Sequence, residues 1–110
     1  MKPKTYAYAV VLIFESSFPN GEYETLYEEE IVMIEATSRE TARANAIAHG
    51  KASEHTYQNE KGETVEVTFK QLVSVQLMDK IAFGSTLYSR SFKDYAAYEQ
   101  FEPMLKGQIA

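Results

Sequence analysis

Cysteine is absent from this chain of 110 residues. Disulfides, thiolate zinc sites, iron–sulfur clusters and cysteine nucleophiles are therefore excluded by chemistry. The absence fits a reducing compartment, and we expect a cytoplasmic protein.

Long hydrophobic runs are also missing. A short apolar run from Ala7 to Phe14 follows a basic start, as in a signal peptide. We reject that interpretation because Tyr6 and Tyr8 interrupt the segment, Glu15 ends it and no small-residue cleavage site follows. No stretch approaches the roughly 18 apolar residues of a membrane helix. We expect no membrane contact.

Clusters of basic residues are lacking as well. The chain has 11 basic and 16 acidic residues, which gives a formal net charge of −5, and its basic residues are scattered. Non-specific affinity for nucleic acid comes from clustered cations that release counterions from phosphate. We therefore expect no nucleic-acid binding.

Recognised catalytic motifs do not occur. The five glycines are isolated, so there is no phosphate-binding loop, and no serine has the context of a nucleophile elbow. The only histidines, His49 and His55, are not spaced to share a helix face, which excludes a His-x-x-x-His zinc motif. We expect His49 to lie near the carbonyl groups of a helix C-terminus and His55 to lie on the surface.

Apolar residues make up 45% of the chain and aromatic residues 13%. A chain of this length and composition can bury roughly two thirds of its unfolded surface in one core. We predict a single domain over residues 1–110, with a core from about 6 to 102 and a frayed tail at 103–110.

Two extended segments begin the fold. Aromatic and β-branched residues predict strands over 6–15 and 23–36, and the Asn20-Gly21 pair in the loop between them predicts an antiparallel hairpin. After Glu30 both faces of the second segment are apolar, so we expect its C-terminal half to be the more deeply buried part.

A helix follows. Thr37 and Glu40 have the spacing of a capping box, and Ala42 with Ala46 form a small-residue face that allows close approach to a sheet. Gly50 is the natural end of this helix, although an extension to His55 is left open.

The rest of the chain predicts a turn at 57–62, a long alternating strand over 65–77, a last strand over 85–92 at a sheet edge, and a short helix after Ser91 and Asp94. The long strand exceeds the usual length, which predicts a bulge near Lys70-Gln71. The order ββαββα predicts an α+β fold, with an antiparallel sheet of about four strands and helices packed on one face.

These elements resemble a known family. The segments that carry the resemblance are Leu26 to Ala36, the Ala-rich helix, Tyr57 with Gly62 to Val65, and Leu87 to Arg90. The chain looks like the bacterial domain of unknown function numbered four-two-eight-eight, over roughly Tyr6 to Phe92. The resemblance implies a short, cysteine-poor bacterial cytoplasmic protein, and no catalytic residue is carried over from it.

Glu28, Glu29 and Glu30 form the densest charge cluster. On a strand Glu28 and Glu30 project to the same face about 7 Å apart, where they could hold Mg²⁺ or Ca²⁺ with help from Glu63 or Asp79. The interpretation that we favour is a solvated strand end whose charges prevent edge-to-edge aggregation.

Arg90 is placed beside Tyr88 in the predicted last strand. A cross-strand ion pair of Arg90 with Glu28 or Glu30 is the favoured interpretation, and an anion-binding arginine is the alternative.

Tyrosine is the most unusual residue count, with eight in the chain. Tyr88, Tyr95 and Tyr98 cluster with Phe92 and Phe101 near the C-terminus. These rings either cover one end of the core or form a surface for a partner, because tyrosine buries a large area at low entropic cost.

The leading hypothesis is a non-catalytic protein-interaction module that engages another protein or a second copy of itself, for example as an acidic inhibitor or a homodimer. The rival hypothesis is a small carboxylate- or metal-dependent enzyme. We expect no cofactor, no resident metal and no catalytic residue. The candidate binding residues are Glu28, Glu30, Tyr88, Arg90, Tyr95 and Tyr98.

Overall fold

The computed structural model describes residues 3–19, 23–102 and 105. Its elements are β1 (Tyr6–Ser17), β2 (Leu26–Ala36), α1 (Arg39–Ala52), β3 (His55–Gln58), β4 (Thr64–Met78) and α2 (Tyr95–Phe101). The α+β class and the antiparallel sheet of four strands are confirmed. The order ββαββα matches in outline only, because the structure has the strand β3 and no strand over 85–92. The predicted Asn20-Gly21 turn and, apart from Leu105, the predicted frayed tail lie outside the described residues.

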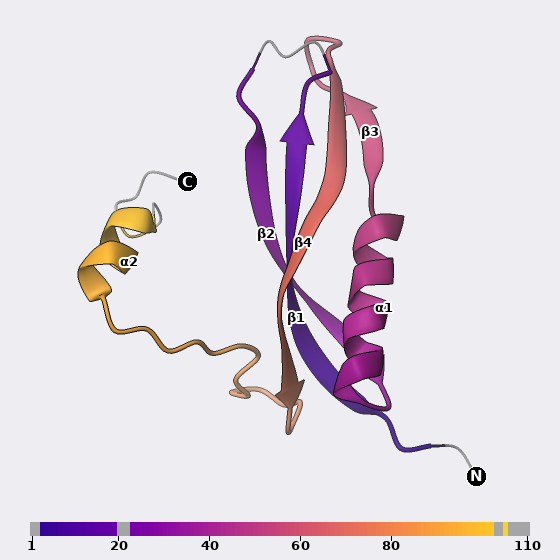
Figure 1. Ribbon diagram of the computed structural model, residues 1–110, viewed down its shortest axis with the longest axis vertical. Helices are drawn as coiled ribbons and strands as arrows, with labels where there is room; N and C mark the ends of the chain where they lie inside the picture. The colour runs from indigo at the N-terminus through magenta and orange to yellow at the C-terminus, as the bar shows by residue number, and fades with distance from the viewer. Residues whose placement is uncertain (1–2, 20–22, 103–104, 106–110) are drawn as a thin grey trace.

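The four strands form one antiparallel sheet in the order β2-β1-β4-β3 (Figure 1). β1 is an inner strand, and its Val10 pairs with Val32 of β2 on one side and with Val75 of β4 on the other. Val10 and Leu12 are fully buried. The apolar run from Ala7 to Phe14 therefore lies in the interior of the sheet.

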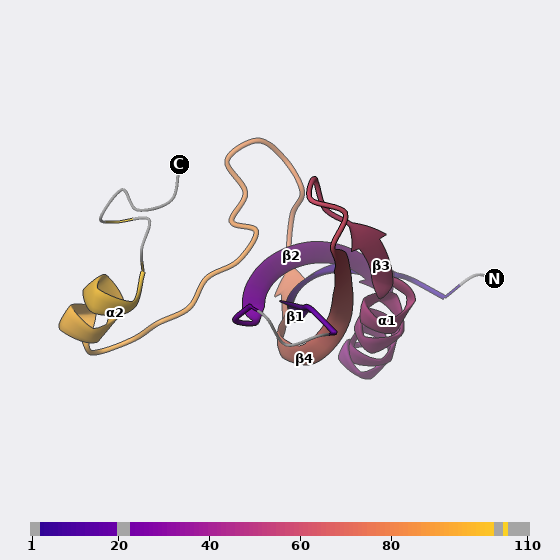
Figure 2. The same ribbon diagram turned by 90° about the horizontal axis from the view of Figure 1, so that it is seen from above.

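Helix α1 covers one face of the sheet (Figures 1 and 2). Alternate residues of β1 meet the buried Ala42 and Ala46 of α1 in a single core cluster. Gly50 lies directly against the ring of Phe69, and a Cβ added there would sit 2.5 Å from the nearest ring atom. Small residues therefore allow the helix to approach the sheet closely, as the sequence predicts.

The start of α1 differs by one residue from the capping box that we expected. Ser38, rather than Thr37, is the N-cap, and its hydroxyl accepts a hydrogen bond of 3.1 Å from the backbone N–H of Thr41. The helix continues two residues past Gly50 because no positive backbone angle is required there, and it ends at Ala52.

The strand β3 was not predicted. The segment 55–58 contains exposed polar and aromatic residues and was assigned to a helix extension and a turn, but it pairs with the start of β4. The predicted bulge is confirmed, because the register of β1 against β4 shifts between Val11 and Leu12 and again between Ile13 and Phe14. These shifts leave Lys70 and Val73 of β4 without a Cα partner on β1.

The predicted strand over 85–92 is wrong, because these residues form no strand. Instead the chain leaves β4 and crosses the face of the sheet opposite α1, which we call the outer face. Gln76 pairs with Ala9 on that face. The side-chain amide of Gln76 donates a hydrogen bond to the carbonyl of Ser89, and its side-chain oxygen accepts one from the backbone N–H of Ser89. A side chain therefore replaces the strand pairing that we expected.

The expectation that both helices pack on one face is not confirmed, because α2 contacts no other helix or strand of the described chain. Figure 2 shows α2 standing apart from the sheet and α1. The radius of gyration is 17.1 Å, whereas a compact chain of this length has about 13 Å. The described helices include none that is long and apolar enough to cross a membrane.

Candidate functional site

Glu28 and Glu30 lie on the same face of the sheet as α1, because they pair with Phe14 and Leu12 of β1. Together with Ser53, His55 and other residues of all four strands they line a cavity of about 340 Å³. We call this cavity the acidic trough. Its lining residues are Phe14, Ser16, Glu28, Glu30, Ser53, His55, Tyr57 and Val67.

The two carboxylates of the trough interact. The pKa of Glu30 is raised from its ordinary value of 4.5 by a hydrogen bond with Glu28, by partial burial and by the negative charge of Glu28. The positive potential of His49 acts in the opposite direction. No lysine or arginine lines the trough, so no such cation in its lining offsets the repulsion between the two carboxylates, which favours the protonated form of Glu30.

The opposite wall of the trough is aromatic. The rings of His55 and Tyr57 stack with their centroids 5.9 Å apart. Nδ1 of His55 lies 2.9 Å from the carbonyl oxygen of Ser53. A carbonyl can only accept, so Nδ1 carries the proton of that hydrogen bond. Carboxylates facing aromatic rings form a site that suits a cationic group.

The possible metal ligands that the sequence offers do not come together. Glu63 lies in the turn between β3 and β4, where its carboxylate accepts from the side chain of Asn59, and Asp79 lies in the loop after β4. Within the described ranges there is no group of three or more His, Asp or Glu side chains that could hold a metal ion.

The predicted pairing of Arg90 with the glutamates of β2 does not form either. The predicted ion pair of Arg90 with Glu28 or Glu30 is wrong: Arg90 is not in a strand, and no such pair occurs among the residues that the structure describes. Tyr88 and Arg90 belong to the irregular segment that crosses the outer face.

The tyrosines of the C-terminal segment do cluster, but away from the core. The ring of Tyr98 stacks on Phe92 at 4.6 Å and lies 6.3 Å from Tyr95. Tyr95 is 59% exposed and Phe101 is 86% exposed. We call residues 90–101 the arm. Its rings pack on one another rather than over an end of the core.

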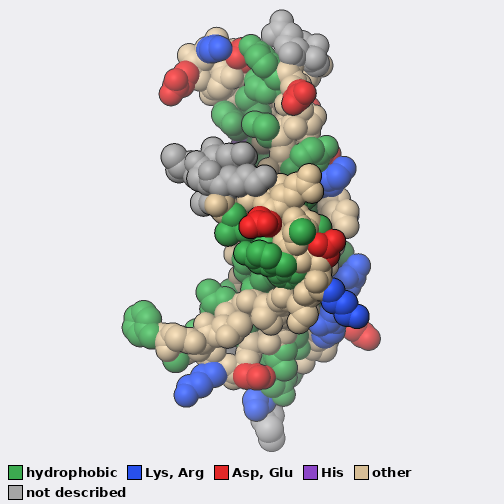
Figure 3. Space-filling view, turned by 90° about the vertical axis from the view of Figure 1, so that its left-hand side faces the viewer, with side chains coloured by type: hydrophobic (Ala, Val, Ile, Leu, Met, Phe, Trp, Pro, Cys, Tyr) green, Lys and Arg blue, Asp and Glu red, His purple; other side chains and the backbone are tan. Residues whose placement is uncertain are grey.

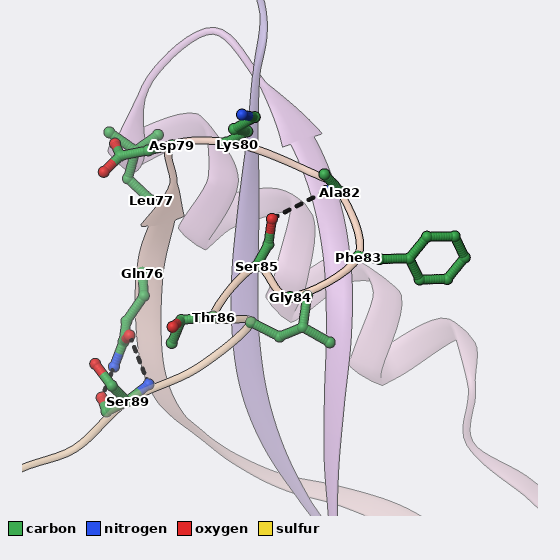
Figure 4. A pocket seen from close by; sticks show the side chains of 11 residues that line it. Gln76, Leu77, Asp79, Lys80, Ala82, Phe83, Gly84, Ser85, Thr86 and Ser89 are labelled. Atoms are coloured by element: carbon green, nitrogen blue, oxygen red, sulfur yellow. Dashed lines mark hydrogen bonds between the residues drawn. The ribbon is translucent and has the colours of Figure 1, made fainter.

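The loop after β4 forms a second cavity, of about 560 Å³, between Gln76 and the segment 79–89 (Figure 4). Its backbone is held by the Gln76–Ser89 pair and by the hydroxyl of Ser85, which accepts from the N–H of Ala82 at 2.9 Å. Phe83 points away from this cavity and is fully exposed (Figure 4).

Several exposed apolar residues were not singled out from the sequence. Ile31 and Met33 of β2 are 51% and 61% exposed on the outer face. The C-terminal half of β2 is still its more buried half, as expected, because Val32, Ile34 and Ala36 belong to the core or pack against it. Figure 3 shows hydrophobic side chains mixed with acidic ones along the side of the molecule where α2 lies. For Phe83, the sequence offers one signal of exposure, which is an aromatic residue followed by a glycine within a loop.

No curated protein and no solved structure matches this chain. A family model matches residues 7–89, which include the sheet apart from Tyr6, α1 and the segment as far as Ser89, and exclude the arm. The match lies within the range Tyr6 to Phe92 of the sequence resemblance and covers nearly all of it. This chain therefore belongs to the family described as Domain of unknown function (DUF4288).

Proposed function

We propose that this protein is a single-domain, non-catalytic protein-interaction module that engages another protein or a second copy of itself. The observation that carries the proposal is the arm, since α2 contacts no other element of the described chain and exposes Tyr95 and Phe101. In line with the family resemblance and the lack of cysteine, we further propose that it acts in a bacterial cytoplasm.

The length of α2 supports this proposal. The helix has seven residues and is capped by Asp94, whose side chain accepts from the N–H of Ala97 at 3.0 Å. Isolated helices shorter than about 12 residues are marginal in water, and most helices gain their stability from a packed apolar face. A partner that covers this face would supply the missing packing, at about 1.5–3 kcal/mol for each large side chain that becomes fully buried.

The charge of the molecule restricts the class of partner. A net charge of −5 disfavours nucleic acid and favours a neutral or basic protein. An inhibitor of a basic protein and a homodimer are the two forms of the proposal.

The test combines light scattering on a sizing column with capture of partners from the native lysate. Wild type is expected to form a dimer or to retain one partner stoichiometrically, and the double variant Tyr95→Ser/Tyr98→Ser is expected to lose that association. Tyr6→Ser is the matched control, because Tyr6 is a partly exposed tyrosine remote from the arm in sequence. A protein that is monomeric and retains nothing, or a double variant that behaves as wild type, contradicts the proposal.

A second candidate, a carboxylate-dependent enzyme, is favoured by one observation. The pKa of Glu30 is raised by the neighbouring Glu28 in a trough that also contains His55, and paired carboxylates of this kind serve as general acid and base. Thermal melting with Mg²⁺, Mn²⁺ and Ca²⁺ tests the metal-dependent form, because an ion that binds the folded state raises the melting temperature. Unchanged melting contradicts it.

A further inference from the structure

The outer edge of β2 is an unpaired strand edge. All residues of β2 pair with β1 in one continuous register from Leu26 to Ala36, and no strand of the described chain lies on its other side. A proline, a lysine or a bulge would protect such an edge, and β2 contains none of these. A regular edge of 11 residues is a template on which another strand can pair.

The charge of this edge is of one sign. Between Leu26 and Ala36 there are four glutamates and no lysine or arginine. None of these glutamates forms an ion pair in the part of the chain that the structure describes. Lys70 lies over the ring of Tyr27, and its ion pair is with Glu15 of β1.

The glutamates are divided between the two faces of the sheet. Glu28 and Glu30 project on the α1 face into the acidic trough, and Glu29 projects on the outer face beside the exposed Ile31. A strand added along β2 would place its own residues next to these at the spacing of cross-strand neighbours, about 5 Å. Basic residues there would meet carboxylates on both faces, and an apolar residue would meet Ile31.

From this edge we infer that β2 binds an extended basic segment of a partner protein, which adds to the sheet as a fifth strand. The inference rests on the proposed function and names the chemistry of the partner. Charge complementarity selects the occupant, because a second copy of the chain would bring four more glutamates to an edge that already has four.

The probe is an octapeptide of alternating lysine and valine, blocked at both ends and fluorescently labelled. Anisotropy is expected to report saturable binding to the wild-type protein that weakens as salt is added. The double variant Glu28→Gln/Glu30→Gln keeps side-chain size and is expected to weaken binding by about tenfold or more, the range for truncated charge pairs at interfaces. Hydrogen exchange of the β2 amides is expected to slow when the peptide binds.

Two control peptides separate strand pairing from simple charge attraction. A peptide with an N-methyl group on every residue keeps its charge but has no backbone N–H to donate from either edge, so it cannot form the ladder and is expected not to bind. A peptide with glutamate in place of lysine is expected not to bind either. Equal binding of the N-methylated peptide overturns the inference, and this comparison uses only the wild-type protein.

The remaining outcomes are also decisive. If the lysine peptide does not bind, or if β2 exchange slows with protein concentration alone, the inference is overturned, and the second result identifies another copy as the occupant. The arm variant Tyr95→Ser/Tyr98→Ser separates the two proposals. Loss of partner capture on that variant, with no peptide binding to wild type, leaves the interaction module standing and removes the β2 site.

Discussion

The two edges of this sheet differ in length and in what is attached to them. β3 has four residues and directly follows α1, whereas β2 has 11 and carries four glutamates. The β3 side is further fixed by Glu54, whose carboxylate accepts from the N–H of Phe69 at 2.9 Å. A short edge attached to a helix offers little backbone to another chain, while a long edge protected only by charge excludes acidic or neutral strands and admits basic ones.

The carboxylates at the two edges also differ in the direction of their pKa shifts. At the β2 edge Glu28 raises the pKa of Glu30. In the turn that connects β3 to β4, hydrogen bonds from Asn59 and Tyr23 lower the pKa of Glu63. The surroundings therefore favour the charged form of Glu63 and disfavour that of Glu30.

A large-to-small substitution in the buried inner strand β1 should have the largest effect. Leu12 is fully buried in β1, the strand that connects β2 to β4. We expect Leu12→Ala to lower the free energy of unfolding by about 2–5 kcal/mol through lost transfer energy and a cavity. Urea denaturation measures this loss. Leu26→Ala is the matched control at a position that is 68% exposed, and equal losses for the two variants would contradict a core centred on β1.

Overpacking of the contact between α1 and β4 should have the next largest effect. In Gly50→Ala the new Cβ would lie within 2.5–2.8 Å of three atoms of the Phe69 ring. We expect a loss of about 1–3 kcal/mol from overpacking, partly offset by the better helix propensity of alanine.

A double-mutant cycle tests the cause of that loss. If the ring of Phe69 is the obstacle, Gly50→Ala should cost less in a Phe69→Leu background than in wild type, as measured by urea denaturation. Additive losses would show that the contact between α1 and β4 is not responsible.

The two edges should respond to pH in opposite directions. The folded pKa of Glu30 lies above 4.5, so the folded state binds the proton more tightly and stability falls as pH rises from 4.5 through that raised value. The folded pKa of Glu63 lies below 4.5, so its stabilising contribution is present above 4.5 and is lost as pH falls through that lowered value.

Carboxyl titrations followed by NMR check both directions. Glu28→Gln should return the pKa of Glu30 toward 4.5, and Asn59→Ala should do the same for Glu63 from the other side. A Glu30 titration that does not respond to Glu28→Gln would mean that the two carboxylates of the trough do not interact.

The smallest effect is expected on the outer face of β2. Met33 is 61% exposed there, so Met33→Lys should change the unfolding free energy by no more than about 0.5 kcal/mol. The same variant should weaken the binding of the lysine peptide, because it places a positive charge beside the added strand. A thermal melt that drops by many degrees would show that Met33 is covered in the folded protein.

Local patterns predicted the elements that have strong periodic signals. The alternating residues of β1 and β4, the small-residue face at Ala42 and Ala46, and the bulge near Lys70 were all readable, since each depends on neighbours in the chain. The segment 55–58 has no apolar alternation of its own. It becomes a strand because α1 delivers it to the open edge of β4, and such long-range pairing leaves no local trace.

The candidate site could be predicted only in part, because local sequence patterns do not indicate which distant residues meet in the folded chain. A period of two places Glu28 and Glu30 on one face, but nothing local indicates that His55 and Tyr57 line the same trough. The segment 85–92 alternates as a strand does, yet Gln76 pairs with Ser89 through its side chain, so the backbone of the segment stays out of the sheet.

The sequence by itself determined the α+β class, the absence of cysteine chemistry, the acidic charge and the placement of Glu28 and Glu30 on one face of a strand, because these follow from composition and from periodicity along the chain. Only the tertiary structure decided that β2 is the open edge, that the arm stands apart, and that the carboxylates face aromatic rings. Strand order and helix docking depend on which distant surfaces bury the most apolar area together, and that is a property of the folded chain.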